Sequence, residues 1–402
     1  MMDKNEILTG QVAHVRKMLF DSGESLSDEE AGKIIEDYLF ENDYGLTLPE
    51  FKERVRKIYA RTRSKLGILA LYLEKEGVNE IMINGRENLF FEDEKGISHR
   101  KNELASTDEL EEIIRNIAAG VHREINEMHP ILDARLADGS RVNAVYRNVA
   151  VNGPALTIRR FAKNRITIDQ MIGGKTLSAE CGSFLKLMVE CRYNIFVSGG
   201  TSSGKTTFLN ALSDFIPKDE RVIVIEDSTE LQLQGIENLV QMECRNANSL
   251  GQGEVSMDML IKTSLRMRPD RIIVGEVRGK EVSDMLQAMN TGHDGSMSTG
   301  HGNSVSGMLR RLESMYLMSA KIPLDAIRAQ IVEGIEIMVH LGRFGNGERK
   351  VMEIQELCDY EGNKYVLNPL FYLDSDGMLK YTGNRLKRRN KLILKGYDGC
   401  GL

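Results

Sequence analysis

The segment Gly199–Thr207 (GGTSSGKTT) constrains the fold more than any other feature of this 402-residue chain. It fits the pattern G-x-x-x-x-G-K-[ST], a loop between a β-strand and an α-helix whose successive backbone N–H groups wrap phosphate. The apolar run Ile195–Val197 precedes the loop and an amphipathic stretch follows it, as the pattern requires. The sequence therefore predicts a nucleotide-binding α/β domain, in which the positive end of the helix adds to phosphate binding.

Every residue of this phosphate loop is a candidate nucleotide ligand. We expect Lys205 to reach the β- and γ-phosphates as a point charge and the hydroxyl of Thr206 to bind Mg²⁺. ATP with Mg²⁺ is therefore the predicted ligand. The predicted nucleotide-binding set is Gly199, Gly200, Thr201, Ser202, Ser203, Gly204, Lys205, Thr206 and Thr207.

Two further apolar runs end in carboxylates. The run 222–227 (VIVIED) ends in Glu226 and Asp227, and the run 271–278 (RIIVGEVR) carries Glu276 directly after Gly275. The carboxyl ends of parallel strands meet at one edge of a sheet, where ligands bind. We expect Glu226 and Asp227 near the metal, and Glu276 as the base that orients and deprotonates the attacking water. The alternatives are a capping role for the first pair and a surface position for Glu276, with Glu230 as the base.

Two histidines, His293 and His301, lie eight residues apart in the Gly- and Ser-rich segment 290–304. The spacing differs from that of the HExxH zinc motif, and no cysteine is near, so a zinc site is not expected. A phosphate-sensing role is one interpretation. A purely structural role is the other.

The pattern of predicted helices and strands changes along the chain and predicts four parts. Residues 1–69 carry helical periodicity and a capping box, Ser27 with Glu30, which marks a small helical bundle. Residues 70–162 mix short strands with one helix and predict an α+β domain. Residues 163–179 are expected to be a polar linker, and residues 180–402 alternate strands and helices as an α/β domain does.

Composition limits the partners and the compartment. The net charge of -6 does not favour nucleic acid as a partner, and the five scattered cysteines fit a reducing cytoplasm. No signal peptide or membrane-spanning run is expected, so any membrane association would be peripheral. The segment 385–391 has five basic residues. It could meet anionic lipid or an acidic partner, or it could be a solvated tail.

Taken in order, these motifs resemble those of the ATPases of type II and type IV secretion systems and type IV pili. GGTSSGKTT, VIEDSTEL, RPDRIIVGEVRG and TGHDGSMSTGHGNS follow one another, with DARLADGSRVNAV and GPALTIRRF upstream. The chain is most similar to the CpaF-type ATPase of Tad/Flp pilus assembly, over roughly residues 70–360. The four-cysteine zinc module of the type II branch is missing, and Gly300 and Gly302 flank His301 where that family is less flexible.

The resemblance implies a RecA-like C-terminal domain, a smaller N-terminal domain and a cytoplasmic hexamer. It implies that N-terminal arginines close over the phosphates, where a guanidinium stabilises the transferring group. It also implies that His293 and His301 belong to the site, with His301 as the better match to the γ-phosphate sensor. The matching arginines are Arg135, Arg141, and Arg159 or Arg160. Interdomain salt bridges are the alternative role of these arginines.

The function implied by the resemblance is that of an ATP-hydrolysing motor. Such a motor would sit at the cytoplasmic face of the inner membrane, contact membrane platform proteins and act indirectly on a pilin or a secreted substrate. Hinge motion about residues 162–180 would do the work. A conjugation or DNA-translocation ATPase of the same superfamily is one alternative. A structural adaptor that binds ATP with little turnover is the other.

Overall fold

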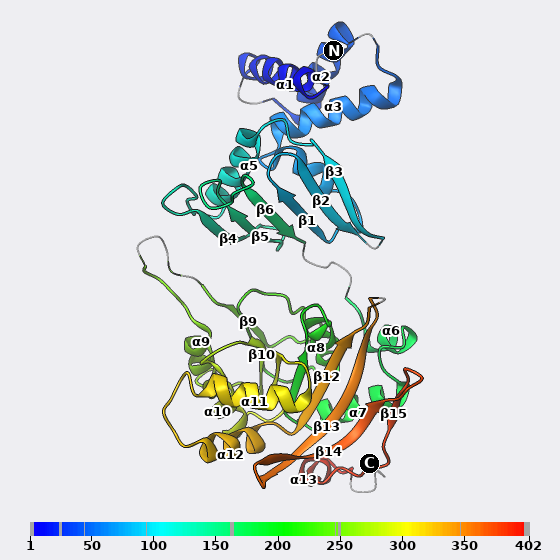
Figure 1. Ribbon diagram of the computed structural model, residues 1–402, viewed down its shortest axis with the longest axis vertical. Helices are drawn as coiled ribbons and strands as arrows, with labels where there is room; N and C mark the ends of the chain where they lie inside the picture. The colour runs from blue at the N-terminus through cyan, green and yellow to red at the C-terminus, as the bar shows by residue number, and fades with distance from the viewer. Residues whose placement is uncertain are drawn as a thin grey trace. The chain divides into compact units, whose positions relative to one another are not determined.

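The computed structural model describes residues 4–23, 26–43, 45–93, 95–160, 165–245, 247, 251–345 and 347–397. The chain divides into two compact units, Met1–Lys163 and Asn164–Leu402 (Figure 1). Each unit has its own hydrophobic core. Among the described residues, no helix is long and apolar enough to cross a membrane.

The first unit begins with three helices, α1 (Lys4–Asp21), α2 (Asp28–Asn42) and α3 (Leu48–Arg63). The predicted capping box starts α2. Glu30 Oε2 accepts the N–H of Ser27 at 2.8 Å, and Ser27 Oγ accepts the N–H of Glu30 at 3.2 Å. The helices bury a small common core of aliphatic side chains, which includes Val15, Ala31, Ile35, Leu39 and Ile58.

This bundle has its own hydrophobic cluster, and a buried ion pair links it to the α+β part that follows. The side chain of Arg61 in α3 is only 6% exposed and pairs with Glu109 Oε1 at 2.8 Å. It also donates to the backbone carbonyl of Glu103 at 2.5 Å. The short helices η1 (Gly67–Leu69) and α4 (Ala70–Leu73) continue directly from α3. Because a buried ion pair joins them, residues 4–160 form one compact unit.

A six-stranded antiparallel sheet makes up the rest of the first unit, with the strand order β3-β2-β1-β6-β5-β4. Alternate residues of its strands face a core covered by α5 (Thr107–Gly120), whose start is capped by Ser106 Oγ. The other face of the sheet carries the polar residues of each strand. The strands are β1 (Glu80–Asn84), β2 (Asn88–Asp93), β3 (Gly96–Lys101), β4 (Ile131–Arg135), β5 (Arg141–Val145) and β6 (Ala155–Arg159).

The second unit has a nine-stranded sheet in the order β15-β14-β13-β12-β7-β11-β10-β8-β9. The six strands from β12 to β9 are parallel, which confirms the predicted α/β core, and β13–β15 add antiparallel neighbours. The strands are β7 (Ile195–Gly199), β8 (Val222–Glu226), β9 (Leu239–Glu243), β10 (Arg271–Val277), β11 (Met297–His301), β12 (Ile337–Arg343), β13 (Arg349–Glu361), β14 (Lys364–Leu373) and β15 (Leu379–Tyr381).

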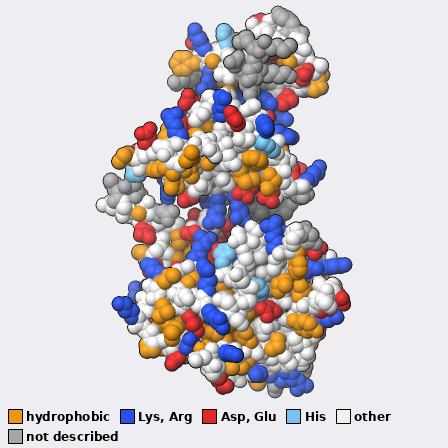
Figure 2. Space-filling model, in the orientation of Figure 1, with side chains coloured by type: hydrophobic (Ala, Val, Ile, Leu, Met, Phe, Trp, Pro, Cys, Tyr) orange, Lys and Arg blue, Asp and Glu red, His pale blue; other side chains and the backbone are white. Residues whose placement is uncertain are grey.

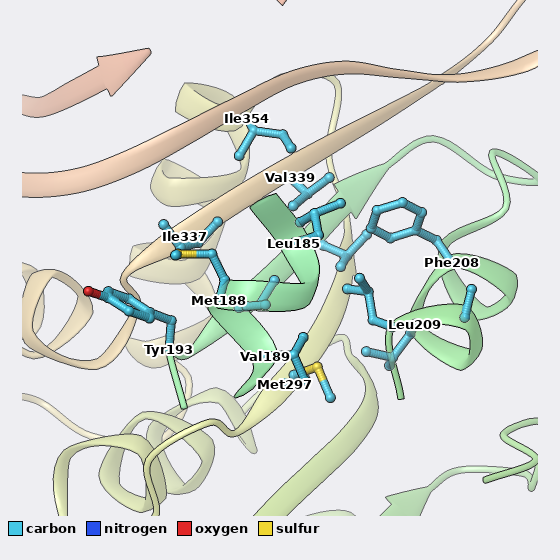
Figure 3. Close-up of a cluster of buried hydrophobic side chains, with 14 of the residues drawn as sticks. Leu185, Met188, Val189, Tyr193, Phe208, Leu209, Met297, Ile337, Val339 and Ile354 are labelled. Carbon is cyan, nitrogen blue, oxygen red and sulfur yellow. The ribbon is translucent and has the colours of Figure 1, made fainter. Parts of the chain in front are cut away.

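Helices cover both faces of this sheet. Successive residues of β7 enter different cores, because side chains alternate along a strand: Ile195 and Val197 join one core and Phe196 the other. Figure 3 shows the first core, where Leu185, Met188 and Phe208 pack against the sheet. The helices are α6 (Ile168–Gly173), α7 (Ala179–Glu190), α8 (Lys205–Ser213), α9 (Met257–Ser264), α10 (Val282–Asn290), α11 (Val305–Tyr316), α12 (Leu324–Gly334) and α13 (Asn390–Leu394).

Most of the predicted linker 163–179 is part of the second unit. Ile168 and Met171 of α6 are buried in its core. Arg165 pairs with Asp214 Oδ1 at 2.7 Å and donates to the carbonyl of Asn210, both near the end of α8. Residues 161–164 lie outside the described ranges. The polar composition of 163–179 suggested a linker, but the buried side chains of Ile168, Met171 and Leu177 and an anchored arginine fix its described part to the core of the second unit.

The basic segment 385–391 is folded onto the second unit and is not a solvated tail. The backbone N–H groups of Lys387 and Arg388 donate to the buried carboxylate of Glu356 at 2.7–2.9 Å. Lys391 Nζ lies 2.6 Å from Glu336 Oε2 and 2.7 Å from Asp294 Oδ1. These acids come from distant strands and loops, so the charge run alone could not show that Lys391 is paired or that the backbone of the segment is held by Glu356.

Candidate functional site

The phosphate loop joins β7 to α8, with β11 on one side of β7 and β12 on the other. Gly199 is the last residue of β7, and a Cβ there would lie 2.4 Å from Ser203 Oγ and 2.7 Å from the carbonyl oxygen of Leu341. Gly204 has a φ of 92°, which side chains disfavour. Both glycines are therefore required by the shape of the loop as well as by the approach of a ligand.

The side chain of Lys205 contacts the backbone of its own loop. Its Nζ donates to the carbonyl of Gly200 at 3.0 Å and of Gly199 at 3.3 Å, and lies 3.3 Å from His301 Nδ1. The residue is only 7% exposed, and burial lowers the pKa of its ammonium group. A cation held inside a loop of carbonyls and N–H groups is placed where phosphate oxygens would bind.

Glu276, near the end of β10, continues the chain of contacts from Lys205. Its Oε1 lies 2.8 Å from His301 Nε2, and its Oε2 accepts from Arg278 Nη2 at 2.8 Å and Nε at 3.0 Å. Burial and the charge of Lys205 lower the pKa of His301, which favours a neutral imidazole. In that form Nδ1 can accept from Lys205. Among the described residues Glu276 Oε1 has no hydrogen-bond partner, so its contact with His301 Nε2 is one of proximity. Thus His301 joins the phosphate-binding cation to the predicted base.

Arg278 connects Glu276 to the neighbouring strand end. Its Nη1 lies 3.5 Å from Asp227 Oδ2, at the end of β8. A cleft of about 240 Å³ opens beside this pair and is lined by Asp227, Cys244, Arg245 and Glu276, among others. Glu276 therefore lies between the phosphate loop and a solvent-filled cleft.

Glu226 does not take the place predicted for a metal ligand. It is 4% exposed, and its carboxylate accepts the backbone N–H groups of Glu230 at 2.9 Å and Leu231 at 3.0 Å. Burial raises its pKa to about 7. Its side chain lies across Gly275, where a Cβ would be 2.8 Å from Glu226 Cγ. Glu226 thus holds the segment after β8 in place, and Gly275 leaves room for it.

The residues fit Mg²⁺ only in part. Thr206 is half-buried and Asp227 is exposed, so each has an oxygen that a cation could reach, unlike Glu226. Over the described ranges, no three His, Cys, Asp or Glu side chains cluster as a protein-only metal site. This is consistent with a cation that takes most of its ligands from phosphate and water, as Mg²⁺ does.

His293 lies far from the phosphate loop. It precedes β11, whereas His301 ends it, so the strand separates the two histidines. His293 Nδ1 lies 3.2 Å from the carbonyl of Ala288, and its own carbonyl accepts from Ser296. The structure therefore brings His301, but not His293, to the phosphate loop, because a strand places its two ends at opposite edges of the sheet.

The four predicted arginines separate into two kinds. Arg135, Arg141 and Arg159 pair across β4, β5 and β6 and form one row on the polar face of the first unit's sheet. Arg160 instead donates through Nη1 to the carbonyls of Lys75 at 2.8 Å and Val78 at 3.1 Å. The register therefore assembles a cationic row from three of the four. Arg160 makes structural contacts, and within the row Arg135 Nε also donates to the carbonyl of Gly139 at 3.2 Å.

Sequence reasoning missed three residues near the loop. Arg278 stands two positions after Glu276, and this period-2 spacing in a strand could have indicated that both point the same way. His340, on β12, lies 2.9 Å from Ser198 Oγ, just before the loop. Arg349 on β13 donates to the carbonyl of Ser202 at 3.0 Å. The partners of His340 and Arg349 are more than 100 residues away in the sequence, so no local pattern marks these two.

Comparison with known proteins identifies a matching family model and several similar proteins. A family model described as "Type II/IV secretion system protein" matches residues 63–337. The chain is 39% identical over 311 residues to the uncharacterized protein MJ0781 of Methanocaldococcus jannaschii, covering 74% of this chain but only 42% of that protein. It is 32% identical over 311 residues to the conjugal transfer protein TrbB of Rhizobium radiobacter, covering 77% of this chain and 92% of that protein.

Among solved structures, the ATPase DotB of Legionella pneumophila matches with a TM-score of 0.52 at 20% identity. The match covers 80% of this chain and 84% of that one. At this identity the likeness concerns the fold alone, and it agrees with the α/β unit and the preceding smaller unit described above.

Proposed function

Because the chain belongs to the type II/IV secretion system protein family, we propose that it is an ATP-hydrolysing motor. It works as a homo-hexamer at the cytoplasmic face of the inner membrane and powers pilus assembly of the Tad/Flp type or protein secretion. The observation that carries the proposal is the chain of contacts Lys205–His301–Glu276 at the phosphate loop. It joins a phosphate-binding cation to a carboxylate base, which is what hydrolysis requires.

Each residue of the site has its own role in the proposed hydrolysis. Lys205 exchanges the carbonyls of Gly199 and Gly200 for phosphate oxygens of ATP. The buried Ser203 hydroxyl, which has no hydrogen-bond partner within the described part of the chain, fits a ligand in the loop. Glu276 orients the attacking water and takes its proton. Bound Mg²⁺ supplies neutralisation of phosphate charge, and Thr206 and Asp227 are the residues that would hold it.

The row Arg135, Arg141 and Arg159 supports a clamp on the nucleotide. Three guanidinium groups on adjacent strands make a rigid cationic surface, which suits the stabilisation of a transferring phosphoryl group. Closure of the first unit on the second, and its release after hydrolysis, would be the motor's stroke. Interdomain salt bridges remain the alternative role of this row.

A conjugation motor is the second candidate. The similarity to TrbB, a conjugal transfer protein, favours it. The net charge of -6, and the mixture of acidic, basic and hydrophobic side chains on the face of the second unit in Figure 2, give no support for direct contact with nucleic acid. Co-purification with pilin-platform proteins or with conjugation proteins distinguishes the two candidates.

The test of the enzymatic proposal is a steady-state ATPase assay with a separate measurement of ATP binding. Lys205→Ala is expected to abolish turnover, because the phosphate charge is no longer neutralised. Glu276→Gln is expected to lower kcat by about 100-fold or more while ATP still binds. Light scattering with a slowly hydrolysed ATP analogue should show hexamers.

Lys186→Ala is the matched control, because Lys186 is exposed on α7 and its nearest acid, Glu190, is 3.9 Å away. It should behave as wild type. Normal turnover in Lys205→Ala would refute the ATPase assignment. A wild-type protein that binds ATP, stays monomeric and does not hydrolyse it would favour the structural adaptor instead.

A further inference from the structure

A hairpin distant in sequence supports the phosphate loop from outside. β12 pairs with β7 so that Leu341 stands opposite Gly199, and β13 follows β12 in antiparallel register. Arg349, the first residue of β13, extends from this hairpin to the loop. Its Nε donates to the carbonyl of Ser202 at 3.0 Å, and its Cδ lies 3.2 Å from the position of a Cβ at Gly204.

The carbonyl that Arg349 holds belongs to an unusual residue. Ser202 has a φ of 57°, in the left-handed region that non-glycine residues seldom occupy. A trans peptide is planar, with its C=O and N–H pointing in opposite directions. When Arg349 holds the Ser202 carbonyl outward, the N–H of Ser203 points into the loop. Its partner among the bonds of the described residues is the carbonyl of Gly200, at a long 3.4 Å.

We propose that Arg349 is a positioning residue that presets the phosphate loop for nucleotide. This inference rests on the proposed ATPase function. The side chain fixes the Ser202–Ser203 peptide so that an N–H already faces the interior of the loop, and this lowers the ordering cost of binding. An arginine suits the task, because its planar guanidinium gives Nε–H one defined direction while its stem packs against Gly204.

The same hairpin supplies a matched control. Arg343 is exposed on β12 and is the direct cross-strand neighbour of Arg349. Of the bonds found among the described residues, none joins Arg343 to the phosphate loop. The two arginines therefore carry the same charge on the same hairpin and differ in contact with the loop.

The test uses the full chain with Arg349→Met, Arg349→Lys and Arg343→Met. Amide hydrogen exchange of residues 199–207 is measured without nucleotide, and the Kd is measured for ADP and for ATP. Arg349→Met should speed exchange in the loop and raise both Kd values by about three- to tenfold, as expected for the loss of one hydrogen bond. At saturating ATP, kcat should change by less than about twofold. Arg349→Lys should restore binding in part, and Arg343→Met should match wild type.

Three results would overturn the proposal. Unchanged exchange and unchanged Kd in Arg349→Met would show that the contact has no effect on the loop. Equal losses in Arg343→Met would assign the effect to charge alone. Weaker binding with unchanged exchange would mean that Arg349 touches the nucleotide directly. If wild type bound no nucleotide, the ATPase proposal would fail, and exchange would still test the loop contact.

Discussion

Gly275 directly precedes Glu276 on β10, and the structure predicts what a side chain at position 275 would cost. In Gly275→Ala the new Cβ would lie 2.8 Å from Glu226 Cγ and 3.2 Å from its Oε1. Glu226 cannot move away freely, because it is 4% exposed and accepts the N–H groups of Glu230 and Leu231. Overpacking of this kind costs about 1–3 kcal/mol, and a weakened hydrogen bond adds about 1 kcal/mol.

The assay is denaturant unfolding of the full chain, followed by circular dichroism. Gly275→Ala should lower the free energy of unfolding of the second unit by about 2 kcal/mol. Gly173→Ala is the control: Gly173 lies in α6 with nothing within 4 Å of its would-be Cβ. That variant should be neutral or stabilised by up to about 1 kcal/mol.

A double-mutant cycle identifies the cause. Glu226→Ala removes the Cγ that the new methyl group meets, so Gly275→Ala should cost less than about 0.5 kcal/mol in that background. An unchanged unfolding midpoint for Gly275→Ala would refute the reasoning. So would an equal cost with and without the Glu226 side chain, because the glycine would then be required for some other reason.

The remaining predictions concern the first unit and the pH response. Arg159→Ala should slow ATP hydrolysis at least about tenfold without loss of stability. Arg160→Ala should lower the free energy of unfolding by about 1 kcal/mol, because Arg160 donates to two backbone carbonyls. ATPase assays and unfolding measurements on both variants check these outcomes. Burial raises the pKa of Glu226 from 4.5 to about 7, so the folded protein holds a proton that the unfolded chain releases. Wild type should therefore lose stability relative to Glu226→Gln as pH rises from 4.5 through 7. A difference in denaturant midpoint between wild type and Glu226→Gln that stays constant across that pH range would contradict the raised pKa of Glu226.

Local chemistry made several features of this chain predictable from sequence. The phosphate loop needs only its glycines, one lysine and the flanking strand and helix, and all of these are adjacent in the sequence. The capping box of Ser27 and Glu30 closes within three residues. The buried parallel strands show as continuous apolar runs, because both of their faces are covered.

Tertiary structure determined which polar side chains are buried and which partners they bind. Glu226 and Asp227 are neighbours in sequence, yet one is buried on backbone N–H groups and the other is exposed. Arg159 and Arg160 differ in the same way, since one joins the cationic row and the other binds carbonyls of residues 75 and 78. Successive residues of a strand point to opposite faces, so their partners are set by register with strands far away in sequence.

The same reason explains the linker and the basic segment. Residues 163–179 were expected to form a polar linker, and 385–391 to bind lipid or an acidic partner or to be a solvated tail. In the fold, Arg165 pairs with Asp214, Lys391 pairs with Glu336, and Glu356 accepts backbone N–H groups of the basic segment. A sequence shows which groups can form such contacts, because donor and acceptor types are local properties. Only the fold shows which groups meet, because burial and pairing depend on segments brought together from the whole chain.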